Sequence, residues 1–188
     1  MKVLSDERPD GVWHKPNSLL YFYNCGVHST ALQSMKQEEK MAIKFQQSAE
    51  SFGLLLLRLS LGVIFIAHGS QKLFGAFGGY GLTATFNAFE EKLGIPPVLT
   101  LLAIIAEFGG GIGVLCGFLT RLSALGIASV MAMAMYKVHA VHGFFLNMPC
   151  LPGKGHGIEF NLALIGMALA LVFTGGGAWS VDRLIWRK

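Results

Sequence analysis

The fold is decided by one stretch of the chain, residues 52–74, which reads FGLLLLRLSLGVIFIAHGSQKLF. A bilayer-spanning helix takes about 20 mostly apolar residues, and this stretch is long enough. It lacks the period-two alternation that is typical of strands, so we expect a helix. Arg58 and His68 interrupt it. An ionisable side chain inside a membrane is unfavourable unless it faces protein or water, so both are predicted to point into a helical bundle.

Three more apolar segments follow, at residues 98–119, 122–141 and 158–174. The first of these contains Glu107, another ionisable group at membrane depth. All three lack strand-like alternation, although the last is somewhat short for a spanning helix. The sequence therefore predicts an all-α membrane protein in which residues 51–188 form a four-transmembrane-helix bundle.

The composition also favours a membrane location. Of the 188 residues, 53% are apolar and 14% are charged, against about 25% charged residues in ordinary soluble domains. The hydrophobicity excludes an intrinsically disordered chain, and the shortage of charges argues against a soluble globule. The net charge is +4, but the basic residues are scattered among apolar segments instead of following one face. We therefore expect the lipid bilayer as a partner, and no nucleic acid.

The first 50 residues differ from the rest of the chain. They hold six basic and six acidic residues and no apolar run long enough to span a bilayer. We interpret residues 1–50 as an N-terminal extension that is disordered, lies on the membrane surface or is not native. In the last case Met35 or Met41 would replace Met1 as the start, because each precedes a short charged run before the first apolar segment.

Lysine and arginine counts predict the orientation of the bundle. With a cytoplasmic N-terminus, ten of these residues lie inside and four outside, which favours both termini in the cytoplasm. Trp179 and Trp186 follow the last segment and suit a membrane–water interface. The four outside residues are Lys72, Lys92, Lys137 and Lys154.

Arg58 and Glu107 are predicted to interact inside the bundle, directly or through water. Counted from the ends of their segments, Arg58 lies about 9 Å deep and Glu107 roughly 14 Å deep from the opposite face, in a core about 30 Å thick. Their depths then differ by roughly 7 Å, much of which an arginine side chain can bridge. Two interpretations stay open: a structural ion pair that fixes the helix register, or two groups that line a ligand or proton site.

A further polar cluster is predicted at the outer end of the bundle. Helical spacing puts Tyr136 on the same face as His139. His139 and His142 form an H-x-x-H pair, which is a weak metal signal, and we assign no metal ligand. The ionisable side chains expected at this end are His68, Lys72, Lys137, His139, His142, His156 and Glu159.

Three chemistries could use such a cluster. Histidines can hydrogen-bond the carbonyl oxygens of a quinone while a carboxylate passes protons. His68 could ligate haem together with His139 or His142, since paired histidines across a helical bundle can hold iron. Imidazole and carboxylate groups can also bind a divalent metal. Quinone is the cofactor we favour, and haem ranks below it.

Glycines in the second apolar segment predict close helix packing. Gly109, Gly113 and Gly117 repeat at four-residue spacing, the pattern that lets membrane helices approach closely. We interpret most of these glycines as packing positions.

Several short motifs follow one another across residues 52–183. The motifs are Arg58-Leu59-Ser60-Leu61-Gly62, Phe65, His68-Gly69, Lys72-Leu73, Gly78-Gly79, Glu107, Gly109-Gly110, Gly117-Phe118-Leu119-Thr120-Arg121, His142-Gly143-Phe144-Phe145, Glu159, Gly177 and Ser180-Val181-Asp182. Their order and spacing resemble the DoxX family of small membrane proteins, whereas residues 1–50 do not match the family pattern.

The resemblance implies a four-helix protein of the bacterial inner (plasma) membrane. Some relatives in this family are membrane subunits of quinone-linked oxidoreductases, including thiosulfate oxidation, and others partner enzymes of oxidative stress and thiol metabolism. A shared fold is not by itself evidence of chemistry, so the resemblance supports the location more strongly than the reaction. The sequence has no Rossmann fingerprint, P-loop or nucleophile elbow, so a partner subunit or small reductant would supply electrons.

We therefore predict a membrane subunit of a quinone-linked oxidoreductase or of a redox and thiol-stress system; whether the chain is itself an enzyme stays open. Its partners would be soluble or membrane oxidoreductase subunits. The alternatives are a small-molecule permease, for which a homo-oligomer would supply enough helices, and a non-catalytic anchor for soluble enzymes.

The predicted catalytic groups are Glu107, Arg58 and His68. The predicted cofactor-binding residues are His139, His142, Glu159, Lys72 and Tyr136.

Overall fold

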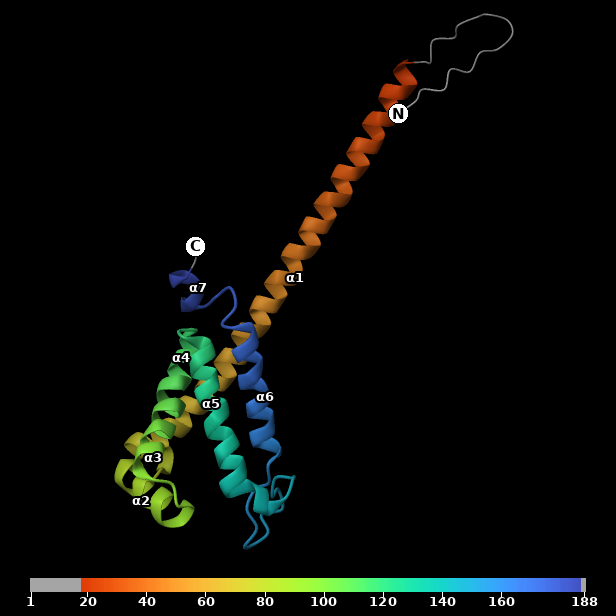
Figure 1. Ribbon diagram of the computed structural model, residues 1–188. Helices are drawn as coiled ribbons and strands as arrows, with labels where there is room; N and C mark the ends of the chain where they lie inside the picture. The colour runs from red at the N-terminus through yellow and green to blue at the C-terminus, as the bar shows by residue number, and fades with distance from the viewer. Residues whose placement is uncertain (1–17, 187–188) are drawn as a thin grey trace, which may run out of the picture. The chain divides into compact units, whose positions relative to one another are not determined.

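The computed structural model describes residues 18–186, and every regular element among them is a helix (Figure 1). The predicted all-α class is therefore confirmed for this part of the chain. η1 and η4 are 3₁₀ turns, whereas η2 and η3 are π-helical turns. The elements in chain order are α1 (Ser18–Phe74), η1 (Ala76–Gly78), α2 (Gly81–Leu93), α3 (Pro97–Ile104), η2 (Ile105–Gly109), α4 (Gly110–Cys116), α5 (Thr120–Ala134), η3 (Met135–His139), η4 (Ala140–His142), α6 (Glu159–Thr174) and α7 (Val181–Ile185).

The chain divides into two compact units, Met1–Gln47 and Ser48–Lys188. Of the predicted N-terminal extension, residues 1–17 with the Met1 start lie outside the described residues, and residues 18–50 are helical. The second unit contains the remainder of α1 and all other helices. Every contact considered below lies within this second unit.

Three helical stretches are long and apolar enough to cross a membrane: Leu32–Phe74, Pro97–Cys116 and Thr120–His142. α6 is also apolar, but its 16 residues extend only about 24 Å, short of a hydrocarbon core about 30 Å thick. The described residues thus fit the predicted multi-pass membrane protein. The fourth span stays a prediction.

Proline and glycine set the ends of the helices in the bundle. Pro97 occupies the first turn of α3, where a helix does not need the N–H that proline lacks. Gly117 ends α4 in the left-handed region, with φ at 73°. A Cβ on Gly117 would also lie 2.6 Å from the guanidinium of Arg58 and from Ser180. Both the backbone conformation and the space around it therefore favour glycine here.

α1 packs antiparallel against the α3–η2–α4 segment at very short range. A Cβ on Gly69 would lie 2.6 Å from the backbone of Phe108, which is closer than real Cβ atoms come. Such contacts let backbones approach as small residues do in membrane helices generally. The close approaches that fix the register are Gly69 against Phe108, Ile66 against Gly111 and Gly62 against Leu115.

The predicted row of Gly109, Gly113 and Gly117 coincides only in part with the surface that packs against α1. A Cβ on Gly113 would meet the Ser123 hydroxyl of α5, so Gly113 allows α4 and α5 to approach. Gly109 has no such neighbour, because its nearest heavy atom would be 3.9 Å away on Ile105. The glycine that faces α1 is Gly111, which lies between the predicted positions.

The buried core joins α1, α4, α5 and α6, which lie side by side in Figure 1. Large apolar side chains on the outer faces are exposed, among them Leu101, Leu122 and Phe173. This distribution is expected where lipid, and not water, surrounds the helices. The core residues are Leu61, Phe65, Val114, Ala124, Ile127, Ala128, Leu164, Ala168 and Leu171.

The short helix α7 caps the beginning of α5. Asp182 accepts hydrogen bonds from the backbone N–H groups of Leu119 (2.7 Å) and Thr120 (2.8 Å) and from the Thr120 hydroxyl (2.7 Å). α5 cannot satisfy these N–H groups itself. Burial alone would raise the pKa of Asp182, but these hydrogen bonds and the nearby charge of Arg58 together hold that pKa below its ordinary value.

Candidate functional site

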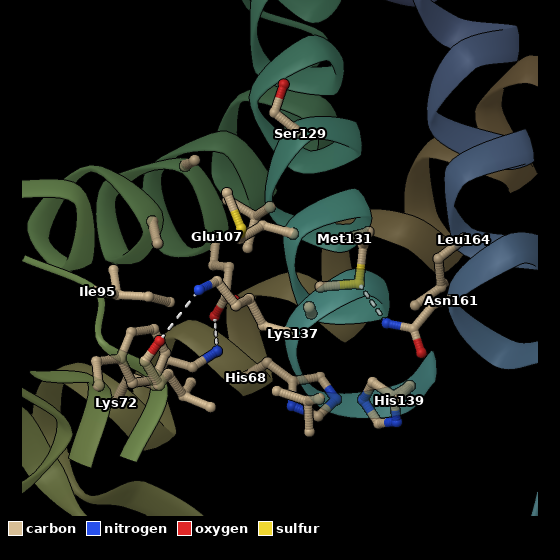
Figure 2. Close-up of a pocket in the computed structure, with 18 of the residues that line it drawn as sticks. His68, Lys72, Ile95, Glu107, Ser129, Met131, Lys137, His139, Asn161 and Leu164 are labelled. Carbon is tan, nitrogen blue, oxygen red and sulfur yellow. Dashed lines mark hydrogen bonds and ion pairs between the residues drawn. The ribbon is translucent and has the colours of Figure 1, made fainter. Parts of the chain in front are cut away.

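A cavity of about 770 Å³ lies among α1, α2, α3–η2, α5–η3 and α6 (Figure 2). Most of its lining is apolar and includes Phe65, Leu102, Met131 and Leu164. Small-molecule sites in proteins combine such surfaces with a few polar groups and enclose about 300–1,000 Å³. The cavity is therefore the candidate site. Its polar lining residues are His68, Lys72, Glu107, Ser129, Lys137, His139, His156 and Asn161.

Lys72 and Glu107 form an ion pair in the wall of the cavity (Figure 2). The Glu107 side chain is 2% exposed, and that of Lys72 is 24% exposed. A buried carboxylate needs a partner of opposite charge or hydrogen-bond donors, and the Lys72 ammonium supplies both. The pair thus puts a proton donor beside a proton acceptor at the edge of an apolar space.

Two π-helical turns carry the ionisable residues that line the cavity from the second and third spans. η2 contains Glu107, and η3 contains Lys137 and His139. A π-turn is wider than an α-helical turn, so it changes which side chains share a face. Such turns occur frequently at functional sites.

Lys137 reaches across the cavity to the end of α2. Its ammonium donates a hydrogen bond to the carbonyl oxygen of Leu93, at 3.3 Å. A cation at a helix C-terminus also interacts favourably with the helix dipole. Figure 2 shows Lys137 and Lys72 on the same side of the cavity as Glu107. This side therefore carries two ammonium groups and one carboxylate.

The hydrogen bonding of His139 fixes which ring nitrogen holds the proton. His139 Nδ1 lies 2.8 Å from the carbonyl oxygen of His156. A carbonyl oxygen only accepts, so Nδ1 is the donor and Nε2 of the neutral ring is left to accept a proton. The loop that supplies this carbonyl is held by Asn147, whose side-chain amide donates to Leu151 (3.1 Å) and Lys154 (2.6 Å).

Half of the eight predicted site residues line the cavity. Those that do are Glu107, His68, Lys72 and His139. Those that lie elsewhere are Arg58, Tyr136, His142 and Glu159. The chemical roles assigned to all eight stay predictions.

The predicted interaction between Arg58 and Glu107 is wrong. The Arg58 side chain is 2% exposed and donates hydrogen bonds only to backbone carbonyls in the described residues. Two of these carbonyls lie in the last turn of α4, and that of Val114 also accepts a hydrogen bond from the N–H of Gly117 (3.2 Å). The acceptors are Val114 (2.9 Å), Leu115 (2.9 Å), Gly176 (2.9 Å) and Trp179 (2.8 Å).

The register between α1 and α4 explains the error. Because Gly69 lies against Phe108, Glu107 is level with residue 70 of α1, within one turn of Lys72. Arg58 lies twelve residues earlier, about 18 Å along the helix. The depths predicted from segment ends assumed that both segments start at a membrane boundary. α1 continues on the N-terminal side of residue 52, so the depth of Arg58 could not be counted from that residue.

The other three residues outside the cavity have local roles. Tyr136 is 74% exposed and does not share the cavity-facing surface of His139, because both lie within the π-turn η3. His142 Nδ1 accepts a hydrogen bond from the N–H of Gly155 (3.2 Å), which holds the following loop. Glu159 lies in the first turn of α6, where a carboxylate suits the helix dipole.

Asn161 lines the cavity but was not among the predicted site residues. It is 4% exposed and lies two positions after Glu159 in an apolar segment. A polar residue in such a segment is expected to face the protein interior, and that signal was available. Lys137 was placed at this end of the bundle without a role, although it lines the cavity.

The positions of the histidines and carboxylates bear on metal binding and on haem binding in different ways. Among residues 18–186, no three side chains of His, Cys, Asp or Glu gather closely enough to hold a metal ion. Of the two histidine pairs considered for haem, His68 and His139 line one cavity, whereas His142 lies outside its lining. Haem at the first pair stays a prediction.

Comparison with known proteins gives matches to membrane proteins. The profile of the DoxX family matches residues 53–140. "Inner membrane protein YqjF" of Escherichia coli (strain K12) is 33% identical over 139 residues, covering 74% of this chain and 96% of the relative. "Putative oxidoreductase CatD" of Bacillus subtilis (strain 168) is 26% identical over 135 residues, covering 72% of this chain and 88% of the relative. No solved structure matches the chain significantly.

Proposed function

The chain belongs to the DoxX family of membrane proteins, and from this premise we propose that its cavity binds a quinone as part of an oxidoreductase system of the bacterial inner membrane. One observation carries the proposal: an apolar cavity of about 770 Å³ has the Lys72–Glu107 pair in its wall. The Bacillus subtilis relative whose name contains "oxidoreductase" gives further support.

The cavity fits a quinone in size and in the character of its lining. A quinone ring with part of its tail needs a mostly apolar space, and the lining supplies Phe65, Leu102 and Leu164. The ring oxygens need hydrogen-bond donors. Lys72 has three N–H donors and uses one of them for Glu107, so the others can reach an oxygen in the cavity.

The residues of the chain can also move protons at this site. A bound quinone supplies the redox chemistry, because it takes up two electrons and two protons to become a quinol. Lys72 donates at Nζ, and Glu107 accepts and returns the proton that this nitrogen shares with it. His139 Nε2 can accept or release a second proton.

The electrons must come from another component. The sequence has no dinucleotide fingerprint, so a partner subunit or a small soluble reductant would deliver them. The chain would then be the membrane-embedded, quinone-binding part of a larger system.

The direct test is quinone content and quinone affinity. Protein purified in mild detergent should yield quinone on solvent extraction, and calorimetric titration with decylubiquinone should give saturable binding. Glu107→Gln should weaken that binding at least about tenfold, because the Lys72 ammonium loses its carboxylate partner. Glu91→Gln, which removes an exposed carboxylate on α2, is the matched control and should bind as the wild type does.

Two results would overturn the proposal. One is wild-type protein that neither carries quinone nor binds it. The other is equal loss of binding in Glu107→Gln and Glu91→Gln, which would mean that the titration does not report on the cavity.

A further inference from the structure

The side chain of Asn161 is a buried polar group that points into the cavity without a strong partner. It lies in the first turn of α6 and is 4% exposed. Its amide nitrogen donates a hydrogen bond to the sulfur of Met131 at 3.7 Å. The amide oxygen accepts no hydrogen bond from any of the described residues, and the residue belongs to the lining of the cavity.

This arrangement leaves most of the hydrogen-bonding capacity of Asn161 unused. A side-chain amide has two donors and one acceptor oxygen, and a thioether is only a weak acceptor. Buried polar groups in native proteins nearly always have partners. A ligand in the cavity is the partner that this position lacks.

Asn161 and His139 form a second polar region of the cavity. Figure 2 shows these two side chains on one side and Lys72, Lys137 and Glu107 on the other. His139 contributes Nε2 there, because its Nδ1 donates to the carbonyl of His156. Apolar lining residues such as Phe65 lie in the same cavity wall. Asn161 and Lys72 therefore lie on opposite sides of the cavity, and His68 also lines the space that they border.

We propose that the cavity selects a ring with oxygens at opposite ends, a para-quinone, and that Asn161 binds the oxygen farther from the Lys72–Glu107 pair. The inference rests on the proposed function and adds the geometry of the ligand. An ortho-quinone carries both oxygens on one edge of its ring and a monoketone carries only one oxygen, so neither presents oxygens to opposite sides of the cavity.

An amide suits this position because the ligand changes its hydrogen bonding when it is reduced. Each carbonyl oxygen of the quinone accepts hydrogen bonds, whereas each hydroxyl of the quinol also donates one. The amide N–H of Asn161 can donate to the first form, and its oxygen can accept from the second. The same residue can therefore hold both forms.

The test compares two bicyclic ligands that differ at the second oxygen. Calorimetric titration uses 2,3-dimethyl-1,4-naphthoquinone, with two opposite carbonyls, and 2,3-dimethyl-1-tetralone, with one. The wild type should bind the first at least about tenfold more tightly. Asn161→Leu, which keeps a similar side-chain volume, should bring the ratio close to one and leave the affinity for the tetralone unchanged.

Asn87→Leu is the matched control, because it makes the same substitution at an exposed position of α2 that does not line the cavity. This variant should keep the wild-type ratio. A wild type with no preference between the ligands overturns the inference even if Asn161→Leu fails to fold. A preference that survives in Asn161→Leu also overturns it and leaves quinone binding intact. A wild type that binds neither ligand overturns this inference and counts against the proposed function.

Discussion

The Lys72 ammonium on α1 contacts the Glu107 carboxylate at the π-turn of the neighbouring antiparallel helix. Arg58, on the same helix as Lys72, is bound entirely by backbone carbonyls about 18 Å away from the level of Glu107. The ionisable groups of the bundle thus have two separate environments. One borders the cavity, and the other ties together the ends of α4, α6 and α7.

The first prediction concerns the ion pair. Lys72→Met leaves a carboxylate that is 2% exposed without its partner, which should lower the free energy of unfolding by about 3–5 kcal/mol at neutral pH. The double variant Lys72→Met/Glu107→Leu removes both charges and should recover most of that loss. Denaturant unfolding in detergent measures the stability. A double variant no more stable than Lys72→Met would mean that the two charges are not coupled.

Arg58 should be a structural residue that lysine cannot replace. A lysine has one nitrogen, so it cannot reach four carbonyls spread over α4 and the loop after α6. Arg58→Lys should therefore lower the free energy of unfolding by about 2–4 kcal/mol, while the affinity of any folded protein for quinone stays unchanged. Arg183→Lys, at an exposed position, is the control in the same unfolding assay. Equal stability of the two variants would contradict the assignment.

Close packing at Gly69 gives a third prediction. A Cβ there would lie 2.6 Å from the Phe108 backbone, so Gly69→Ala should push α1 away from η2 and lower the free energy of unfolding by about 1–3 kcal/mol. It should also weaken quinone binding, because Lys72 lies in the next turn. Gly166→Ala is matched to it, since Gly166 is helical and has open space around it. That control should keep or slightly raise the stability.

Asp182 should make stability depend on acid pH. Its folded pKa lies below the ordinary value of 3.8, so its contribution is present above that value and is lost as the pH falls through the folded pKa. Asp182→Asn should be less stable than the wild type at pH 7, and the difference should shrink below pH 3.8. Unfolding midpoints between pH 7 and pH 3 measure this, with Glu91→Gln as the comparison for losing one exposed carboxylate. A difference that is constant over this range would contradict the role of the carboxylate.

Much of the fold could be predicted from hydrophobic runs, because lipid requires long apolar helices with paired backbone groups. The segment predicted at residues 98–119 corresponds to α3, η2 and α4, and α3 begins one residue earlier, with Pro97 in its first turn. The helical continuation over residues 18–50 could not be read in the same way. That region has mixed charges and lacks a spanning apolar run.

The candidate site was harder to predict, because its geometry depends on irregular turns. A period of 3.6 residues put Tyr136 beside His139, and the π-turn η3 breaks that relation. The partner of Glu107 depends on the register of two antiparallel helices, which contacts such as Gly69 against Phe108 determine. Neither feature has a signal in the order of apolar and polar residues alone.

The fully buried layer of Leu61, Phe65 and Val114 separates the cavity from the end of the bundle that holds Arg58. The side chains of these three residues are apolar and cannot relay a proton. Under the proposed function, a proton exchanged at Glu107 would therefore enter and leave on one side of this layer. Turnover of the kind proposed would then not by itself charge the membrane.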